Sequence, residues 1–193
     1  MMENKQDKIK RGLLESASLK KRVAEENADT ILRIAEEVTR TLKEGGKIII
    51  FGNGGSAADA QHIAAELMGK YLMDREPLPA ISLTVNTSSL TAIANDYSYS
   101  DVFLRQLKGI ARKGDLVWGI STSGNSENVV KALKWAREKG IKTVGFTGEG
   151  GGRMKEYCDL IFEVPSKSTP RIQELHITAG HIICEIVEEE LFR

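Results

Sequence analysis

The chain has 193 residues, enough for one domain with a substantial core, and 41% of them are hydrophobic. Its 27 basic and 27 acidic side chains give a formal net charge of zero, which argues against a general nucleic-acid or membrane-surface binder. The balance does not exclude a small anionic substrate, because backbone amides and hydroxyl groups can hold a phosphate.

The chain also lacks the marks of a secreted or membrane protein. Cys158 and Cys184 are the only cysteines, too few for a disulfide framework. Charged residues begin at Glu3 and no apolar signal segment follows. No apolar run approaches the ~20 residues of a membrane span. We therefore expect a cytoplasmic protein with neither a membrane nor a nucleic acid as partner.

The first 45 residues are predicted to be helical. Apolar residues recur there at helical spacing: Ile31, Ile34, Ala35, Val38 and Leu42. A weaker, lysine-rich helix precedes them, and a break at residues 27–29 resembles a helix cap. An apolar face this far from the rest of the domain needs cover, so residues 1–45 are predicted to serve oligomerisation.

From residue 47 onward, short apolar runs alternate with helical stretches. The runs cover residues 48–51, 80–84, 116–120, 143–146 and 160–164, and the main helical stretches cover 57–68, 127–139 and 171–191. This alternation predicts an α/β fold: a doubly wound, three-layer arrangement with a five-stranded parallel sheet and helices on both faces. With no linker or repeat in view, residues 1–193 are predicted to form a single domain. Ligands of such sheets bind beyond the carboxyl ends of the strands, at the switch point.

A glycine-rich loop follows the first predicted strand, with the sequence Gly52-Asn53-Gly54-Gly55-Ser56-Ala57. Glycines let the backbone approach a ligand closely, and the next helix offers free N–H groups to an anion. The loop also fits the dinucleotide pattern G-x-G-x-x-A, but the second strand runs into Thr84-Val85-Asn86 and supplies no acid for a ribose. Taken alone, the loop fits a ligand cradle and a plain tight turn equally well.

A second polar loop follows the third predicted strand: Ser121-Thr122-Ser123-Gly124-Asn125-Ser126. Its hydroxyl groups and glycine, placed before a helix, are typical of a phosphate-binding nest. The alternative is a polar turn whose serines cap the helix. The position of the loop at the switch point favours phosphate binding.

Two groups of helical side chains are candidates for chemistry. His62 and Glu66 are four residues apart on one helix face, where they could bind zinc, divide acid and base roles, or form an ordinary surface pair. The last helix carries Gln173, Glu174 and His181. Helical periodicity aligns Glu174 with His181 better than Gln173. Spacing alone favours a surface pair for the first group and a structural role for His181.

Several segments together resemble the sugar isomerase (SIS) domain family. They are the two loops, Arg171-Ile172-Gln173-Glu174, Asp59-Ala60-Gln61-His62 followed by Glu66, Asn95-Asp96 and His181. Their order is similar to that in the sedoheptulose-7-phosphate isomerases of this family, from about Asp29 to the C-terminus. Pro170 is a departure, because some members carry an aspartate there, and the sugar preference could differ accordingly.

The resemblance implies an aldose–ketose isomerase that converts sedoheptulose 7-phosphate to D-glycero-D-manno-heptose 7-phosphate through an enediol, the first step of bacterial heptose and lipopolysaccharide biosynthesis. It implies Glu66 and His181 as catalytic residues and one Zn²⁺ per subunit, held by His62, Glu66, Gln173 and His181. The implied substrate contacts are Asn53, Gly54, Gly55, Ser56, Glu66, Asn95, Asp96, Ser121, Thr122, Ser123, Ser126 and Gln173. A homotetramer with active sites between subunits is also implied.

One alternative is a non-catalytic member of the same family. The replication-initiator-associating protein shares the glycine and serine loops but lacks an acid and a histidine at the places of Glu66 and His181. Both are present here, which favours an enzyme over a scaffold that binds a protein partner.

Overall fold

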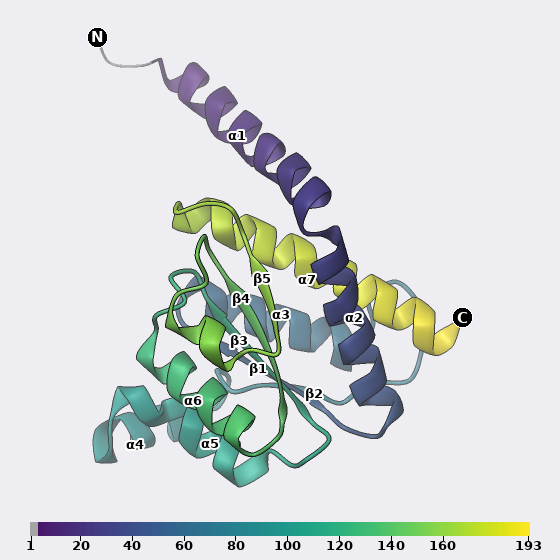
Figure 1. Cartoon of the computed structure of the whole chain (residues 1–193), viewed down its shortest axis with the longest axis vertical. Coiled ribbons are helices and arrows are strands. Elements are labelled where there is room, and N and C mark those ends of the chain that lie inside the picture. Colours follow the sequence, from purple (N-terminus) through teal and green to yellow (C-terminus); the bar gives the residue numbers. More distant parts are fainter. Residues whose placement is uncertain (1–3) are drawn as a thin grey trace.

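The computed structural model describes residues 4–193, which form a sheet enclosed by helices, with one long helix extending from the body (Figure 1). The strands are β1 (Ile48–Gly52), β2 (Ala80–Ser82), β3 (Leu116–Ser121), β4 (Lys142–Thr147) and β5 (Leu160–Glu163). The α-helices are α1 (Lys5–Glu26), α2 (Ala28–Lys43), α3 (Gly55–Met68), α4 (Thr87–Asp96), α5 (Val102–Ile110), α6 (Glu127–Glu138) and α7 (Thr169–Phe192). Two short 3₁₀ helices span Tyr99–Asp101 and Arg153–Tyr157.

The five strands are all parallel and lie in the order β2-β1-β3-β4-β5. The chain moves outward from β1 to β2 and then returns to β3 on the other side of β1. The loops after β1 and β3 therefore meet at the switch point, where a ligand site is expected. The predicted doubly wound, five-stranded parallel sheet is confirmed.

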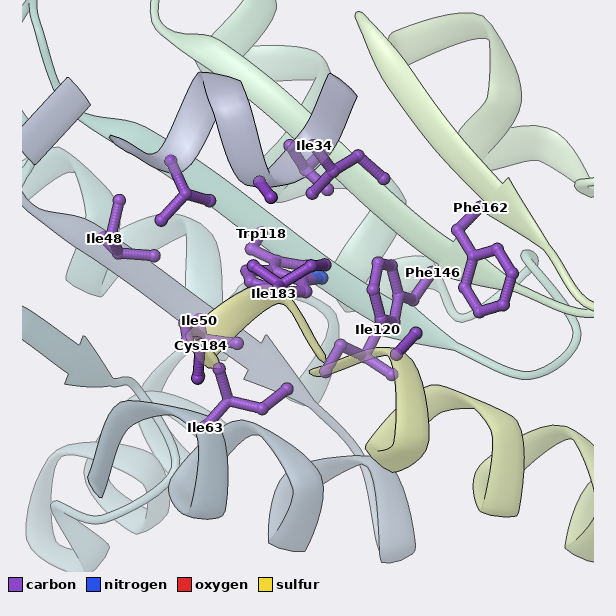
Figure 2. Close-up of a cluster of buried hydrophobic side chains, with 14 of the residues drawn as sticks. Ile34, Ile48, Ile50, Ile63, Trp118, Ile120, Phe146, Phe162, Ile183 and Cys184 are labelled. Atoms are coloured by element: carbon purple, nitrogen blue, oxygen red, sulfur yellow. The ribbon is translucent and has the colours of Figure 1, made fainter. Parts of the chain in front are cut away.

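Side chains alternate across the sheet and create two apolar layers. Ile48 and Ile50 face the layer covered by α2, α3 and α7, whereas Ile49 and Phe51 face the layer covered by α5 and α6. Figure 2 shows the first layer, where Trp118, Phe146 and Phe162 form successive edge-to-face ring contacts. Because both faces are buried, the central strands consist almost entirely of apolar residues.

The N-terminal helices differ in how much of their surface they bury. Helix α2 packs an apolar stripe on the sheet layer, but Val23 is the one buried residue in Lys5–Glu26. The break between α1 and α2 at Asn27 is confirmed. The predicted cap is not: the Asn27 side chain makes no capping hydrogen bond, and the chain passes almost directly from one helix into the next.

Helices α4 and α5 and both 3₁₀ segments were not predicted. Helix α4 has no residue that is fully buried, so its apolar pattern is weak, and α5 is only nine residues long. No helix within residues 4–193 is both long and apolar enough to cross a bilayer.

His176 of α7 is fully buried among the rings of Phe146 and Phe162. Its Nε2 lies 3.1 Å from the Thr147 carbonyl oxygen, to which it donates. Burial lowers the pKa of His176 to about 4, although the Thr147 carbonyl opposes the shift. The imidazole is therefore neutral near pH 7, and its role is structural.

This depressed pKa predicts an acid-sensitive fold. Between about pH 6.5 and pH 4 the unfolded chain binds a proton at His176 that the folded chain does not, so the free energy of unfolding falls as pH falls through this window, by roughly 3 kcal/mol at most. His176→Gln keeps a donor for Thr147 and removes the titration. Urea unfolding at several pH values should show a flatter pH dependence for His176→Gln than for the parent. Equal slopes would contradict the assignment.

Candidate active site

The loops after β1 and β3 are joined by a pair of amide side chains. Asn53 of the glycine loop and the buried Asn128 of α6 donate to each other's carbonyl oxygens, both at 2.9 Å. Tyr99 also donates its hydroxyl to Asn53, at 3.0 Å. Asn128 and Tyr99 were not singled out in the sequence, because neither lies in a recognisable motif. They hold Asn53 at the edge of the loop.

The serine loop brings its hydroxyl groups together. Ser121 Oγ lies 2.9 Å from Ser126 Oγ and 3.5 Å from Ser123 Oγ. Ser126 precedes α6 but makes no side-chain cap hydrogen bond, so the alternative that the serines cap this helix is not supported. Thr122 is half-buried in the same turn. The grouped hydroxyls suit a phosphate better than a helix cap.

A glycine-rich segment, residues 148–154, supports the serine loop from behind. Gly148 donates its backbone N–H to the Thr122 carbonyl and Met154 donates to the Gly124 carbonyl. Gly124 has a φ of +65° and packs so closely on the backbone of Gly151 that a side chain there would collide with it. The shape of the serine loop therefore depends on hydrogen bonds and close backbone contacts with residues 148–154.

Helices α3 and α7 lie side by side and run in the same direction. A methyl group on Gly55, the first residue of α3, would collide with the Gln173 amide near the start of α7. One on Gly180 would lie 2.8 Å from Ile63 Cδ1. Gly180 thus lets α7 pass close to Ile63 of α3, and the two helices begin side by side at Gly55 and Gln173.

This packing brings together three side chains that are far apart in sequence. His62 Nε2 lies 2.9 Å from Glu66 Oε1 and 3.3 Å from His181 Nε2. The two imidazole rings meet edge to face, with centroids 4.9 Å apart. Glu66 and His181 are half-buried, whereas His62 is more exposed. We call His62, Glu66 and His181 the histidine cluster; it is neither a plain surface pair nor a packed structural histidine.

The histidine cluster suits a divalent metal ion. Two imidazole nitrogens and one carboxylate oxygen lie within 4.8 Å of one another. Ligands about 2.0–2.1 Å from a tetrahedral metal are roughly 3.3 Å from each other, close to the distances of His62 Nε2 from Glu66 and from His181. Three protein ligands also leave a fourth position for a water molecule or substrate.

Gln173 and Glu174 belong to the first turns of α7. Gln173 precedes His181 by eight residues, about 12 Å along α7, and its amide contacts Gly55 of the glycine loop. Glu174 accepts a 2.9 Å hydrogen bond from Arg171, so the preference for Glu174 from helical periodicity is not supported. The structure thus brings His62, Glu66 and His181 together and places the Gln173 amide beside Gly55, so the ligand role implied for Gln173 remains a prediction.

The remaining predicted contacts are dispersed. Gly54 has a φ of +57° with open space around its Cα, and Ser56 is buried under the loop. Asn95 and Asp96 are exposed at the end of α4, where Asn95 donates to Asp96 at 2.9 Å. No hydrogen bond within residues 4–193 connects Asn95 or Asp96 to the two loops, so their substrate role remains a prediction.

Asp59 and Tyr71 are further neighbours of the histidine cluster. Asp59 Oδ2 is buried and has no hydrogen-bond partner within residues 4–193. Burial raises the pKa of Asp59 to about 6, partly offset by His62. The Tyr71 ring lies 5.9 Å from the His181 ring. Asp59 belonged to the motif but had no predicted role, and no sequence signal marked Tyr71.

Comparisons with known proteins show the family of the chain. A family model described as "SIS domain" matches residues 13–148. The chain is 50% identical to a phosphoheptose isomerase of Thermodesulfovibrio yellowstonii over 97% of this chain and 93% of that protein. It is 57% identical to one of Clostridium acetobutylicum, over 85% and 84% of the two chains.

Solved structures show the same likeness. A phosphoheptose isomerase from Neisseria gonorrhoeae superposes with a TM-score of 0.92 at 39% identity, covering 96% of this chain and all of that one. One from Francisella tularensis gives 0.93 at 33% identity, over 97% of this chain and 100% of that chain. The chain belongs to the SIS domain family, as the sequence motifs predicted.

Proposed function

We propose that the chain is a phosphoheptose isomerase, which converts sedoheptulose 7-phosphate to D-glycero-D-manno-heptose 7-phosphate in the cytoplasm. Two observations support this: curated relatives about half identical over nearly the whole chain carry that name, and Glu66, His62 and His181 converge. A non-catalytic scaffold would not need the converging acid and histidines.

The two loops are proposed to hold the phosphate end of the sugar. Ser121, Ser123 and Ser126 offer hydroxyl groups and the start of α6 offers free backbone N–H groups, which together can bind an anion without a lysine. Asn53, fixed by Asn128, faces the same region from the glycine loop. Anchoring the phosphate keeps the reacting carbons in register with the histidine cluster.

The histidine cluster is proposed to hold one Zn²⁺ through His62, Glu66 and His181. When bound, the metal would supply a Lewis acid that polarises the sugar carbonyl. Gln173 is the fourth ligand implied by the resemblance. Its contact with Gly55 favours a substrate contact instead, since a carboxamide is an uncommon zinc ligand.

The chemistry requires a proton to leave C1 and return to C2. Glu66 and His181 are the acid and base proposed for these two transfers, because one carboxylate and one imidazole converge there from two different helices. A carboxylate that binds a metal firmly is a poor proton acceptor, so the ligand and base roles of Glu66 compete. The half-buried setting of both groups limits the access of water to the enediol.

The N-terminal helices are proposed to assemble the chain into a homotetramer. Ile9, Leu13 and Leu14 of α1 are more than 60% exposed. A separate apolar groove lies between α1, α2 and α7; it is lined by Val23, Ala28, Leu32, Ala179, Ile182 and Ile186. A second copy of the chain would cover both, and Asn95 and Asp96 could then reach a site in a neighbouring subunit.

Glu66→Gln and His181→Ala are expected to lower kcat by at least about 100-fold, because each removes a proton-transfer group. Formation of the aldose from sedoheptulose 7-phosphate measures the effect, with metal analysis of each variant. Glu185→Gln, at an exposed position of α7, is the control and should retain activity. Near-parental rates in either active-site variant would contradict the assigned roles.

Replacing both Ser121 and Ser126 by alanine should raise KM by about tenfold or more and change kcat less, because the hydroxyl groups serve to bind the phosphate. Steady-state kinetics over a range of substrate concentrations separates the two effects. Ser168→Ala, before α7 and outside the loop, is the control. An unchanged KM would count against the phosphate site.

Introducing charge on α1 should dissociate the assembly. Leu13→Glu together with Leu14→Glu places carboxylates on the exposed apolar surface, and sedimentation velocity should then report a smaller species than the parent. Glu15→Lys changes the charge at an exposed position on the opposite side of the same helix from Ile9 and Leu13, and should leave the assembly intact. Identical sedimentation of parent and double variant would refute the proposed role of α1.

A further inference from the structure

The segment between α3 and β2 is fixed by one buried carboxylate. Glu188 of α7 accepts four N–H donors: the backbones of Tyr71, Leu72 and Met73 at 3.0, 2.8 and 2.7 Å, and Arg75 Nε at 3.0 Å. Each carboxylate oxygen receives two of them. Burial would raise the pKa of Glu188, but these donors hold it below its ordinary value. The carboxylate is therefore charged and fully hydrogen-bonded.

The partner of Glu188, Arg75, binds the end of α3. Its guanidinium donates to the carbonyl oxygens of Glu66, Leu67 and Gly69 at 2.9, 2.8 and 3.2 Å. The last carbonyls of a helix lack intrahelical partners, and a cation there is favoured by the helix dipole. Arg75 thus holds the backbone of Glu66 itself, a member of the histidine cluster.

The Arg75–Glu188 ion pair lies next to the histidine cluster on both α3 and α7. Glu188 follows His181 by seven residues, which places it two turns further along the same face of α7. The segment that Glu188 holds includes Tyr71, whose ring lies 5.9 Å from the His181 ring. The network therefore connects the helix that carries Glu66 with the helix that carries His181, next to both.

Stability alone is a weak reason for such a pair. The side chains of Arg75 and Glu188 are each only 2% exposed. Removing two charges from water costs about as much as their attraction returns, and well-packed apolar residues often stabilise as well or better. What a buried, fully hydrogen-bonded pair adds over apolar packing is a fixed geometry.

We propose that the Arg75–Glu188 ion pair positions the active site, by fixing the end of α3 at Glu66 relative to His181 on α7. The two residues are positioning residues and contact no substrate. The proposal rests on the roles proposed for Glu66 and His181, and deepens them.

A second buried carboxylate offers a matched control. Asp115 accepts hydrogen bonds from the backbones of Lys47 and Arg112 at 3.0 and 2.7 Å and from Lys47 Nζ at 2.6 Å. It is 5% exposed and directly precedes β3, at the end of the strands opposite the two loops. Asp115→Asn therefore disturbs a similar network away from the histidine cluster.

The test compares Glu188→Gln, Arg75→Lys and Asp115→Asn in the full chain. In Glu188→Gln, an NH₂ group that cannot accept a hydrogen bond faces the N–H donors. In Arg75→Lys, the side chain lacks the two NH₂ groups of the guanidinium that reach the carbonyls of Glu66 and Leu67. Three quantities are measured: kcat and KM with sedoheptulose 7-phosphate, the affinity for Co²⁺ from its absorption spectrum, and the melting temperature.

We expect both pair variants to lower kcat and Co²⁺ affinity by roughly tenfold, with KM within about twofold. Asp115→Asn should lower only the melting temperature. The proposal is overturned if the pair variants behave like Asp115→Asn; Arg75→Lys, which keeps a cation beside Glu188, decides the matter if Glu188→Gln does not fold. Failure of the proposed chemistry or metal site would instead appear in the unmodified chain, as absence of turnover or of Co²⁺ binding.

Discussion

The close packing of α3 on α7 is the contact on which the site depends. Both helices cover the same face of the sheet, and Gly180 lets α7 approach Ile63 without an intervening side chain. At this separation His62 and His181 come within 3.3 Å of each other. A larger residue at Gly180 would push the helices apart, and the donor set of the histidine cluster would no longer converge.

The same packing links the two ends of the candidate site. Gln173 contacts the first residue of α3, immediately after the glycine loop, and His181 reaches His62 two turns later. Seven residues of α3, about 10 Å, separate Gly55 from His62. A ligand held at one end by the loops and at the other by the histidine cluster must therefore be an elongated molecule, as a seven-carbon sugar phosphate is.

Carboxylates that bind backbone N–H groups recur in this fold, and two of them, Glu188 and Asp115, are buried. Glu188 fixes the segment after α3, and Asp115 fixes the chain before β1 and β3. Asp159 accepts from the backbone and hydroxyl of Thr143 at 2.9 and 3.0 Å. Each accepts from backbone N–H groups that regular secondary structure leaves unpaired, and such groups are costly when they are buried without a partner. Only Glu188 lies beside the histidine cluster.

The sequence by itself determined the fold class and the order of the strands along the chain. Apolar runs such as Ile48-Ile49-Ile50-Phe51 are buried on both faces, so their pattern does not depend on distant partners. The glycine and serine loops were likewise identifiable, since local backbone chemistry defines them. Helix α4 was missed, because a helix with no fully buried residue leaves little periodicity to read.

Residue spacing did not decide which side chains meet; the family resemblance implied that His62, Glu66 and His181 converge, and the tertiary structure brings them together. Spacing favoured Glu174 as the partner of His181, yet Glu174 binds Arg171 and His181 meets His62, 119 residues away. The supporting residues Asn128, Tyr99 and Glu188 carry no local signal either, because their partners come from other elements. Periodicity reports which face of a helix a residue lies on, but the neighbour across that face is set by the packing of the whole chain.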